Sequence, residues 1–371
     1  MSGIYLGLMS GTSVDSIDAA LVDFSGDAPR LLATHNQPWA AEVRKAILQT
    51  RELDDDELNT LQSLDRATAD CFAEAANACI RQAGIDASQV EAIGSHGQTI
   101  RHRPDAATPF SLQIGDPQRI AELTGIDVVA DFRRADIEAG GQGAPLVPAF
   151  HNAVFRSAEK NRVIVNIGGI ANITILPKDP LLPVTGFDTG PGNTLMDAWT
   201  AKHRQQPFDR DGAFAASGRS DARLLANLLM DDYFRQPPPK STGFETFNLD
   251  WLQAQLDDSI DAADVQSTLC DLTAVSIIRA IKQHAPDTDE MFVCGGGAHN
   301  TELMQRLQSL VALPVASTKQ LGIDPDQVEA MSFAWLARQF KLALPGNIPQ
   351  VTGAREAVVL GTGFAPSHNR A

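Results

Sequence analysis

Three glycine-bearing turns are the first places where this sequence could do chemistry. They are Gly11-Thr12-Ser13, Gly168-Gly169 and Gly295-Gly296-Gly297, and each follows an apolar, strand-like run. Residues without a Cβ leave room for a phosphate group and let backbone N–H groups face the anion. Each turn taken alone is more often an ordinary glycine hairpin or helix stop. The ordered set of three, spread over both halves of the chain, favours a triphosphate site.

Asp188 is the candidate proton acceptor. It ends the predicted strand Val184–Asp188 and precedes the turn Thr189-Gly190-Pro191-Gly192-Asn193. We therefore expect its carboxylate to project from the edge of a sheet toward a cleft. An ordinary aspartate is ionised at pH 7 and can accept a proton. The alternative is that Asp188 caps the helix predicted after Gly192.

Four further residues are candidate ligand contacts, each with a structural alternative. Arg133 could bind a carboxylate through two parallel hydrogen bonds, although Arg134 beside it makes a solvated basic loop an alternative. His96 and Gln98, in a loop predicted after a strand, suit hydroxyl recognition or a structural hydrogen bond. Glu329 begins a predicted helix, where an acidic residue also stabilises the helix dipole.

The acidic and cysteine residues give weaker signals. Asp15 and Asp18 could orient Mg²⁺ through water, but aspartates are also common in surface turns. The four cysteines lack C-x-x-C spacing, which predicts small buried hydrophobic residues; they are Cys71, Cys79, Cys270 and Cys294. The chain contains neither a P-loop nor a dinucleotide-binding fingerprint, and no protein-kinase H-R-D or D-F-G signature.

Composition and net charge restrict the classes of partner that the protein could bind. The 371 residues carry a net charge of −16, from 46 acidic and 30 basic residues. Such a surface repels phosphate backbones, which argues against nucleic acid or an anionic membrane as a partner. No apolar run reaches the roughly 18–20 residues that a membrane helix needs, and the N-terminus lacks a targeting pattern. We expect a cytoplasmic protein of about two domains.

The elements that must position these residues alternate between strands and helices, which predicts an α/β protein with helix-covered sheets. The predicted strands are Ile4–Met9, Ile17–Phe24, Leu31–His35, Val90–Gly94, Phe110–Ile114, Ile126–Phe132, Arg162–Ile167, Ile170–Leu176, Val184–Asp188 and Met291–Cys294. The predicted helices are Asp56–Gly84, one from Asp116-Pro117, one after Asn193 to about Lys202, Thr268–Gln283, Asn300–Leu310 and Glu329–Leu342.

A strand–turn–strand unit occurs twice, at the N-terminus and again around Gly168-Gly169. We interpret the second as a degenerate repeat of the first, each opening one half of the protein. The expected division is an N-terminal lobe of residues 1–135 and a C-terminal lobe of residues 136–344. Residues from about 345 to 371 are expected to pack back on the first lobe.

Several motifs together resemble the signatures of anhydro-N-acetylmuramic acid kinases, within the actin, heat-shock chaperone and sugar-kinase superfamily. They are Gly7–Asp18, Ser95–Thr99, Ala130–Arg133, Gly140–Leu146, Asn166–Asn172, Phe187–Asn193, Cys294–Asn300 and Val328–Met331. The likeness spans essentially the whole chain. It departs from the family pattern at Val14 and Ser16, where methionine and glycine are expected, and Ser16 narrows the conformations open to the turn.

This resemblance implies a two-lobed actin-like fold with a central cleft, binding ATP with Mg²⁺. It implies Asp188 as the catalytic base, and His96, Gln98, Arg133 and Glu329 as sugar contacts. It also implies a cytoplasmic homodimer. The nucleotide contacts that it implies are Gly11, Thr12, Ser13, Val14, Asp15, Ser16, Ile17, Asp18, Asn166, Gly168, Gly169, Gly190, Gly192, Asn193, Gly295, Gly296 and Gly297.

The implied reaction opens 1,6-anhydro-N-acetylmuramic acid with water and phosphorylates its 6-oxygen. One alternative is another sugar kinase of the superfamily, although the zinc cluster of the repressor-related kinases is missing and the chain is short for the glycerol-kinase group. A second alternative is a non-catalytic ATP-driven clamp or chaperone. Chaperones of this superfamily carry a peptide-binding domain after the ATPase, for which the sequence up to Ala371 leaves no room.

Overall fold

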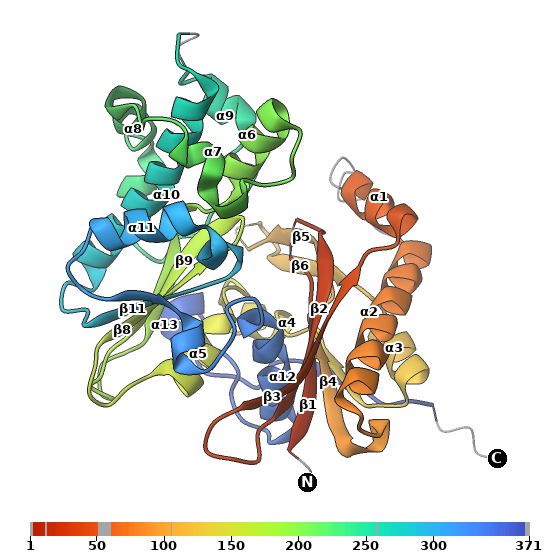
Figure 1. Ribbon diagram of the computed structural model, residues 1–371. Helices are drawn as coiled ribbons and strands as arrows, with labels where there is room; N and C mark the ends of the chain where they lie inside the picture. Colours follow the sequence, from red (N-terminus) through yellow and green to blue (C-terminus); the bar gives the residue numbers. More distant parts are fainter. Residues whose placement is uncertain (1–2, 12, 51–60, 105, 257–258, 368–371) are drawn as a thin grey trace. The chain divides into compact units, whose positions relative to one another are not determined.

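The computed structural model describes residues 3–11, 13–50, 61–104, 106–256 and 259–367, and it forms two compact units (Figure 1). The first unit comprises residues 1–150 and 327–371, and the second comprises residues 151–326. Residues 136–150 and 327–344 therefore pack with the first unit, although the sequence-based division assigned them to the C-terminal lobe. None of the helices in the described ranges is long and apolar enough to cross a membrane.

The first unit is built on a six-stranded sheet with the order β13-β7-β4-β1-β2-β3, and β5 and β6 form a separate pair. Its strands are β1 (Ile4–Met9), β2 (Ser16–Asp23), β3 (Arg30–Pro38), β4 (Val90–Ser95), β5 (Gln98–Arg103), β6 (Phe110–Ile114), β7 (Val128–Ala130) and β13 (Thr362–Phe364). Its helices are α1 (Ala41–Gln49), α2 (Gln62–Ala83), η3 (Ala87–Gln89), α3 (Pro117–Thr124), α4 (Arg134–Glu138), α12 (Val328–Lys341) and α13 (Pro349–Thr352); α5 (Val147–Phe155) contains the point where this unit ends.

The second unit is built on a five-stranded sheet with the order β10-β9-β8-β11-β12. Its strands are β8 (Arg162–Ile167), β9 (Ile170–Leu176), β10 (Thr185–Pro191), β11 (Glu290–Cys294) and β12 (Val315–Ser317). Its helices are α6 (Thr194–Arg204), η4 (Arg210–Gly212), α7 (Ala213–Ala216), α8 (Ala222–Leu228), η5 (Asp232–Arg235), α9 (Leu249–Gln253), α10 (Ala262–His284), η6 (Gly296–His299), α11 (Thr301–Ser309) and η7 (Thr318–Leu321).

The two sheets repeat one topology. In each, three consecutive strands run antiparallel, and the first of them pairs in parallel with a later strand: β1 with β4, and β8 with β11. The repeat predicted from the two strand–turn–strand units is therefore confirmed, and so is the duplicated α/β fold of the actin-like class. Both phosphate-turn candidates lie at the hairpin bend of their sheet, after β1 and between β8 and β9.

Two glycines in the first sheet let α12 pack directly on the strands. A Cβ on Gly7 of β1 would lie 1.8 Å from the Ala330 carbonyl oxygen, and one on Gly94 of β4 would lie 2.0 Å from the Phe333 carbonyl oxygen. Only glycine allows a helix backbone to approach this closely. The opposite side of the sheet is covered by α2, whose buried residues include Phe72 (Figure 1). The helix bearing Glu329 is thus held tightly against β1 and β4.

The helix boundaries mostly follow local signals. Asp116 caps α3 by accepting the backbone N–H groups of Gln118 and Arg119, and Pro117 takes the first helical position, as predicted. Gly84 ends α2 in a left-handed conformation with φ of 67°. The predicted start of that helix at Asp56 lies outside the described residues.

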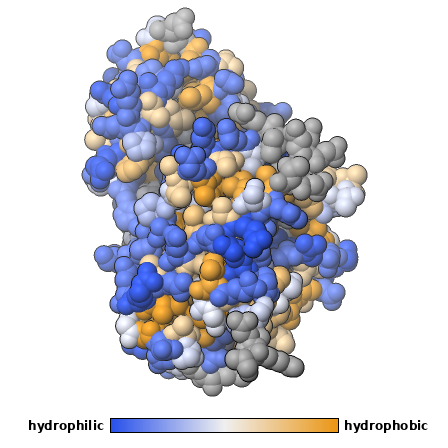
Figure 2. Space-filling view, turned by 90° about the vertical axis from the view of Figure 1, so that its right-hand side faces the viewer, coloured by the Kyte–Doolittle hydropathy of each residue, from blue (hydrophilic) through white to orange (hydrophobic). Residues whose placement is uncertain are grey.

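Figure 2 shows hydrophilic residues over much of one face of the chain, with small hydrophobic groups between them.

Candidate active site

Backbone hydrogen bonds from the residues at the start of α6 hold the Gly168-Gly169 turn of the second unit in place. The backbone N–H of Gly192 donates to the Gly169 carbonyl at 2.8 Å, and that of Asn193 donates to the Gly168 carbonyl at 2.8 Å. Thr194 adds a bond to the Gly169 carbonyl at 3.1 Å. These contacts use the carbonyl oxygens of the turn, so they set its shape while leaving its N–H groups to face a ligand.

The late glycine turn packs beside the same hairpin. A Cβ on Gly297 would lie 2.4 Å from the Ile167 side chain, and one on Gly295 would lie 2.5 Å from the Asn166 amide oxygen. Asn193 donates its side-chain amide to the Ile167 carbonyl at 3.2 Å. The second unit therefore brings together most of its predicted nucleotide contacts, which are Asn166, Gly168, Gly169, Gly192, Asn193, Gly295, Gly296 and Gly297.

The glycines predicted to contact nucleotide fall into two kinds. Gly192, Gly295 and Gly297 have no room for a Cβ, so the fold itself requires them. At four others, Gly11, Gly168, Gly169 and Gly296, the nearest atom to an added Cβ lies 3.6 to 3.8 Å away, and φ is not in the left-handed region. Packing and backbone conformation therefore do not explain why these four residues are glycine. Open space of this kind beside the backbone would admit an anion such as phosphate.

Asp188 lies inside β10, which continues three residues beyond the predicted end of this strand, to Pro191. The pairing of β10 with β9 shifts register between Asp188 and Gly190. Such a bulge turns a side chain away from the regular alternation of the strand. The helix that follows is α6, and its N-cap residue is Asn193. The capping alternative for Asp188 is therefore excluded.

The carboxylate of Asp188 lies half-buried against the loop after η5. Thr242 donates its backbone N–H to Oδ2 of Asp188 at 3.0 Å, and Tyr233 donates its hydroxyl to the Asp188 carbonyl at 2.7 Å. Lys240 donates its amine to the Tyr233 carbonyl at 3.0 Å. Burial raises the pKa of Asp188 to about 7, while the Thr242 hydrogen bond and the Lys240 charge act in the opposite direction. A carboxylate with this pKa is a suitable general base near neutral pH.

The first unit contributes the other predicted turn, between β1 and β2. Val14 donates its backbone N–H to the Gly11 carbonyl at 3.2 Å, and Ser10 donates its hydroxyl to the Ser16 carbonyl at 2.8 Å. Val14 is buried with φ of 55°, an unusual conformation for a β-branched residue. Gln98 donates its amide to the Gly11 carbonyl at 3.3 Å. Thr12, which the resemblance implies as a nucleotide contact, lies outside the described residues.

The two acidic residues of this turn already have partners. Asn36 donates its amide to Asp18 Oδ1 at 2.7 Å, and the exposed Asp15 lies 3.7 Å from Arg44. Across the described ranges, the structure has no group of three His, Cys, Asp or Glu residues that could hold a metal ion. This donor set suits an Mg²⁺ ion carried mainly by nucleotide phosphates, because Mg²⁺ usually keeps several of its waters.

The buried His96 and the half-buried Arg133 form a pair in the first unit. Nε and Nη2 of Arg133 lie 3.3 and 2.9 Å from Nε2 of His96, and Nη1 donates to the Gly143 carbonyl at 3.1 Å. Burial and the Arg133 charge hold the pKa of His96 well below its usual range, so the ring is neutral. Because Nε2 accepts from the guanidinium, the ring proton is on Nδ1.

Glu329 acts on this pair from the first turn of α12. Burial lowers the pKa of Arg133 to about 10, and the Glu329 charge raises it, so the guanidinium stays protonated at neutral pH. Phe333, one turn further along α12, packs its ring 4.7 Å from that of His96. The structure thus brings three of the four predicted sugar contacts together, and the fourth, Gln98, lies on the adjacent strand β5.

Three buried polar atoms at or near this pair have no hydrogen-bond partner among the described residues. Ser95, His96 and Gln98 are buried, and Oγ, Nδ1 and Oε1 of these residues have no hydrogen-bond partner among the described residues. Buried polar groups are rarely left unpaired in a folded protein, because each costs free energy without a partner. Three such atoms lie within four positions of the chain, at two of the predicted sugar contacts and the residue before them.

Comparison with known proteins gives a single assignment. Residues 3–366 match the family model of anhydro-N-acetylmuramic acid kinase. A protein of that name from Shewanella amazonensis is 55% identical over 97% of this chain and 98% of its own length, and one from Shewanella halifaxensis is 53% identical over 98% of each. The chain belongs to the anhydro-N-acetylmuramic acid kinase family. The sequence-based resemblance is thereby confirmed.

More distant solved structures cover similar lengths. Component A of the Acidaminococcus fermentans (R)-2-hydroxyglutaryl-CoA dehydratase aligns with 89% of this chain and 96% of its own, at 10% identity and a TM-score of 0.49. A ROK family glucokinase from Streptomyces griseus, solved with glucose and AMPPNP, covers 91% and 100% at 14% identity and a TM-score of 0.43. We base the assignment on the family match alone.

Sequence reasoning missed the residues that surround the candidate base of this kinase-family chain. Tyr233 lies in η5, and Lys240 and Thr242 lie in the loop after it, about fifty positions from Asp188 in the sequence. The positively charged Lys240 next to three prolines was the one available signal. Gly190 was predicted to bind nucleotide. A Cβ added to this residue would lie 2.7 Å from the Phe234 ring, so packing against that ring also requires glycine here.

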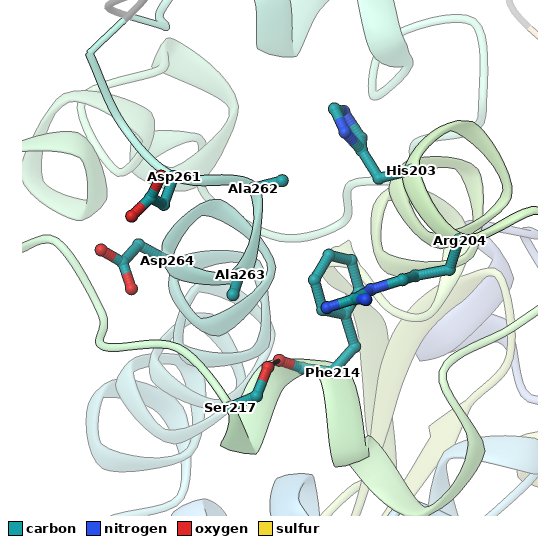
Figure 3. Close-up of a pocket in the computed structure, with 8 residues that line it drawn as sticks. All are labelled: His203, Arg204, Phe214, Ser217, Asp261, Ala262, Ala263 and Asp264. Carbon is teal, nitrogen blue, oxygen red and sulfur yellow. Dashed lines mark hydrogen bonds between the residues drawn. The ribbon is translucent and has the colours of Figure 1, made fainter.

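A separate hollow of about 320 Å³ lies in the helical part of the second unit, at the start of α10 (Figure 3). Arg204 lies across the Phe214 ring with its guanidinium 4.4 Å from the ring centroid, and the carboxylates of Asp261 and Asp264 lie on the other side. The predicted catalytic and binding residues do not line it. Its acidic and basic side chains offset one another and do not indicate a particular ligand.

Proposed function

We propose that this chain is an ATP-dependent kinase that opens 1,6-anhydro-N-acetylmuramic acid with water and phosphorylates the freed 6-hydroxyl, giving N-acetylmuramic acid 6-phosphate. The observation that carries the proposal is the half-buried Asp188, with a pKa of about 7, in the same unit as a glycine cluster that has room for phosphate. Membership of the anhydro-N-acetylmuramic acid kinase family supports the substrate.

In the proposed reaction, Asp188 takes a proton from a water molecule. The water oxygen bonds to the anomeric carbon, and the bond from that carbon to the bridging 6-oxygen breaks. The freed 6-oxygen then attacks the γ-phosphorus of ATP, and the bond to ADP breaks. Asp188 returns the proton to solvent, so atoms and charge balance. A base whose pKa is close to the working pH is ionised often enough to accept and basic enough to help.

The remaining residues bind and orient in this proposal. Arg133 pairs with the carboxylate of the lactyl group, and the unpaired atoms of Ser95, His96 and Gln98 meet polar groups of the sugar. The open glycines admit the phosphates. Mg²⁺, when bound with ATP, neutralises phosphate charge. We further propose a cytoplasmic homodimer that serves peptidoglycan recycling, as the family resemblance implies.

Two alternatives are weaker. Another sugar kinase of the superfamily would not account for a full-length match to this family at more than 50% identity. A non-catalytic ATP-driven clamp would have no use for a half-buried carboxylate with a raised pKa.

The test is to incubate the protein with Mg·ATP and a panel of sugars in ¹⁸O-labelled water and to identify the products by mass spectrometry. We expect a phosphorylated product from 1,6-anhydro-N-acetylmuramic acid, with one labelled oxygen at the anomeric carbon. Glucose and N-acetylglucosamine should react far more slowly. Equal or faster phosphorylation of either simple sugar would contradict the proposal, and product without label would contradict the hydrolytic step.

A further inference from the structure

Asp136, in α4 of the first unit, is a completely buried carboxylate that joins three segments of the chain. Its Oδ1 accepts the side-chain amide of Asn347 at 2.6 Å and the hydroxyl of Thr352 at 2.7 Å. Its Oδ2 accepts the backbone N–H of Gly143 at 2.8 Å. One side chain thus ties the glycine loop after α4 to the segment around α13, more than 200 positions away.

The glycine loop packs closely against this carboxylate. A Cβ on Gly141 would lie 2.2 Å from Oδ2 of Asp136, so the loop can approach only because that residue is glycine. Two backbone bonds hold the loop and its flank to the same distant segment: the N–H of Gln142 donates to the Thr352 carbonyl at 2.8 Å, and that of Arg355 donates to the Ala139 carbonyl at 2.9 Å. The position of Gly143 is therefore set from several directions.

Gly143 passes this constraint to Arg133. Its N–H is held by Asp136, and its carbonyl accepts Nη1 of Arg133 at 3.1 Å. The residue has φ of 69°, and a Cβ there would lie 2.9 Å from the Ile137 side chain and 3.2 Å from Cβ of Arg133. The connection from Asp136 through Gly143 to Arg133 thus runs through two direct hydrogen bonds on one residue.

The guanidinium of Arg133 is restrained from both sides as a result. Gly143 accepts from Nη1, and Nε2 of His96 accepts from Nε and Nη2. Arginine has five N–H donors, so two of them, one on each terminal nitrogen, have no partner among the described residues. A restrained arginine loses less side-chain freedom on binding than a mobile one, and its fork geometry suits a carboxylate.

We propose that Asp136 is a positioning residue that orients Arg133 for a substrate carboxylate, and that this makes the site selective for a sugar acid over the neutral anhydro-amino sugar. This inference rests on the proposed function for the identity of the sugar. Asp136 itself does not touch substrate. Its effect is on how well Arg133 is placed before the substrate arrives.

The test is Asp136→Asn with two sugars. Asparagine keeps the shape but replaces one accepting oxygen with an NH₂ group, so Gly143 or the α13 segment loses its bond. We expect KM for 1,6-anhydro-N-acetylmuramic acid to rise about tenfold, because misplaced groups bind poorly, with kcat and KM for ATP changed less than about twofold. Calorimetry should show the same weakening for this sugar. Binding of 1,6-anhydro-N-acetylglucosamine, which lacks the carboxylate, should not change.

Asp209→Asn is the matched control. Asp209 of the second unit is also buried and also accepts three hydrogen bonds, here from two backbone N–H groups and one side-chain amide, but it has no described link to Arg133. This control should leave the ratio of the two sugar affinities unchanged. Thr352→Val provides a second variant in case Asp136→Asn does not fold, since it removes one donor to Asp136 at constant shape. We expect it to weaken binding of the acidic sugar alone, by about threefold.

The outcomes separate the two proposals. Equal weakening of both sugars and ATP, or no weakening in a folded Asp136→Asn or Thr352→Val variant, would show that Asp136 only supports the fold. Failure of the wild-type protein to form any phosphorylated sugar would contradict the proposed function. In that case the calorimetric ratio of the two sugars would still decide the role of Asp136.

Discussion

Two aspartates of the second unit, Asp188 and Asp209, are both largely removed from solvent, yet their surroundings differ in kind. Asp209 accepts the backbone N–H groups of Phe214 and Ala215 at 2.8 and 2.9 Å and the side-chain amide of Gln266 at 3.2 Å. Among the described residues, the carboxylate of Asp188 has one hydrogen-bond donor, the N–H of Thr242. Asp209 therefore serves the fold, whereas Asp188 retains the capacity to accept a proton.

The same distinction separates the glycines. Gly297 and Gly295 are required by packing, while Gly169 and Gly11 occupy positions where a side chain would meet nothing closer than 3.6 Å. A residue that the fold does not explain is the better guide to a ligand. This distinction between glycines can be tested by comparing two variants, one at a glycine that packing requires and one at a glycine beside open space.

The largest effect is expected from Asp188→Asn. Asparagine keeps the size of the side chain and can still accept from Thr242, but it cannot take a proton. We expect kcat to fall by about 10³–10⁴ or more, with KM for ATP nearly unchanged. A folded Asp188→Asn variant that retains more than about a tenth of wild-type kcat would show that Asp188 is not the base.

The paired variant, Asp209→Asn, should do the reverse. It should keep kcat within about twofold but lose about 2–3 kcal/mol of unfolding free energy, because an NH₂ group would face a backbone N–H that needs an acceptor. Urea unfolding measures this loss. A large fall in kcat with unchanged stability would reverse the roles that we assign to the two aspartates.

The next effect concerns the glycines. Gly169→Val and Gly11→Val should fold, because the added side chains find open space, but they should raise KM for ATP by about tenfold or more by crowding the phosphates. Gly297→Ala is the control, since its Cβ would lie 2.4 Å from Ile167. It should lower the thermal midpoint instead. If Gly169→Val binds ATP as the wild type does, the open space there has another cause.

The smallest effect is a shift in pH dependence. Asp188 must be ionised to act, and its pKa is about 7, so kcat/KM should rise with pH through about 7 and level off above 8. The Lys240 charge lowers the pKa of Asp188. Lys240→Met should therefore move the midpoint upward, reducing activity several-fold at pH 6 and little at pH 9. Lys240→Arg, which keeps the charge, should stay close to the wild-type profile; an unshifted Lys240→Met profile would exclude this electrostatic role.

Local patterns in the sequence were enough to predict much of this structure. Both hairpins, the cap at Asp116, the stop at Gly84 and the helix that begins near Glu329 follow from residues a few positions apart. The glycine turns and Asp188 were also identifiable, because each stands where an apolar run meets a turn. The resemblance then supplied the family, which the comparisons confirm.

Contacts between distant segments could not be predicted in this way. Thr242 lies 54 positions from Asp188, and Thr352 lies 216 positions from Asp136, so no spacing rule connects them. The packing of α12 on Gly7 and Gly94 likewise depends on which strands become neighbours in the sheet. For the same reason, the continuation of β10 past Asp188 through a bulge could not be predicted.

The interrupted first unit has a consequence for the order in which the protein can be made. Its strands β1 to β7 leave the ribosome early, but α12, α13 and β13, which complete the sheet and hold Asp136, are translated only after the whole second unit. The second unit is continuous and can fold as it emerges. A nascent chain halted at residue 326 would therefore already contain Asp188 and its neighbouring glycines, while Asp136 would still lack its Asn347 and Thr352 partners.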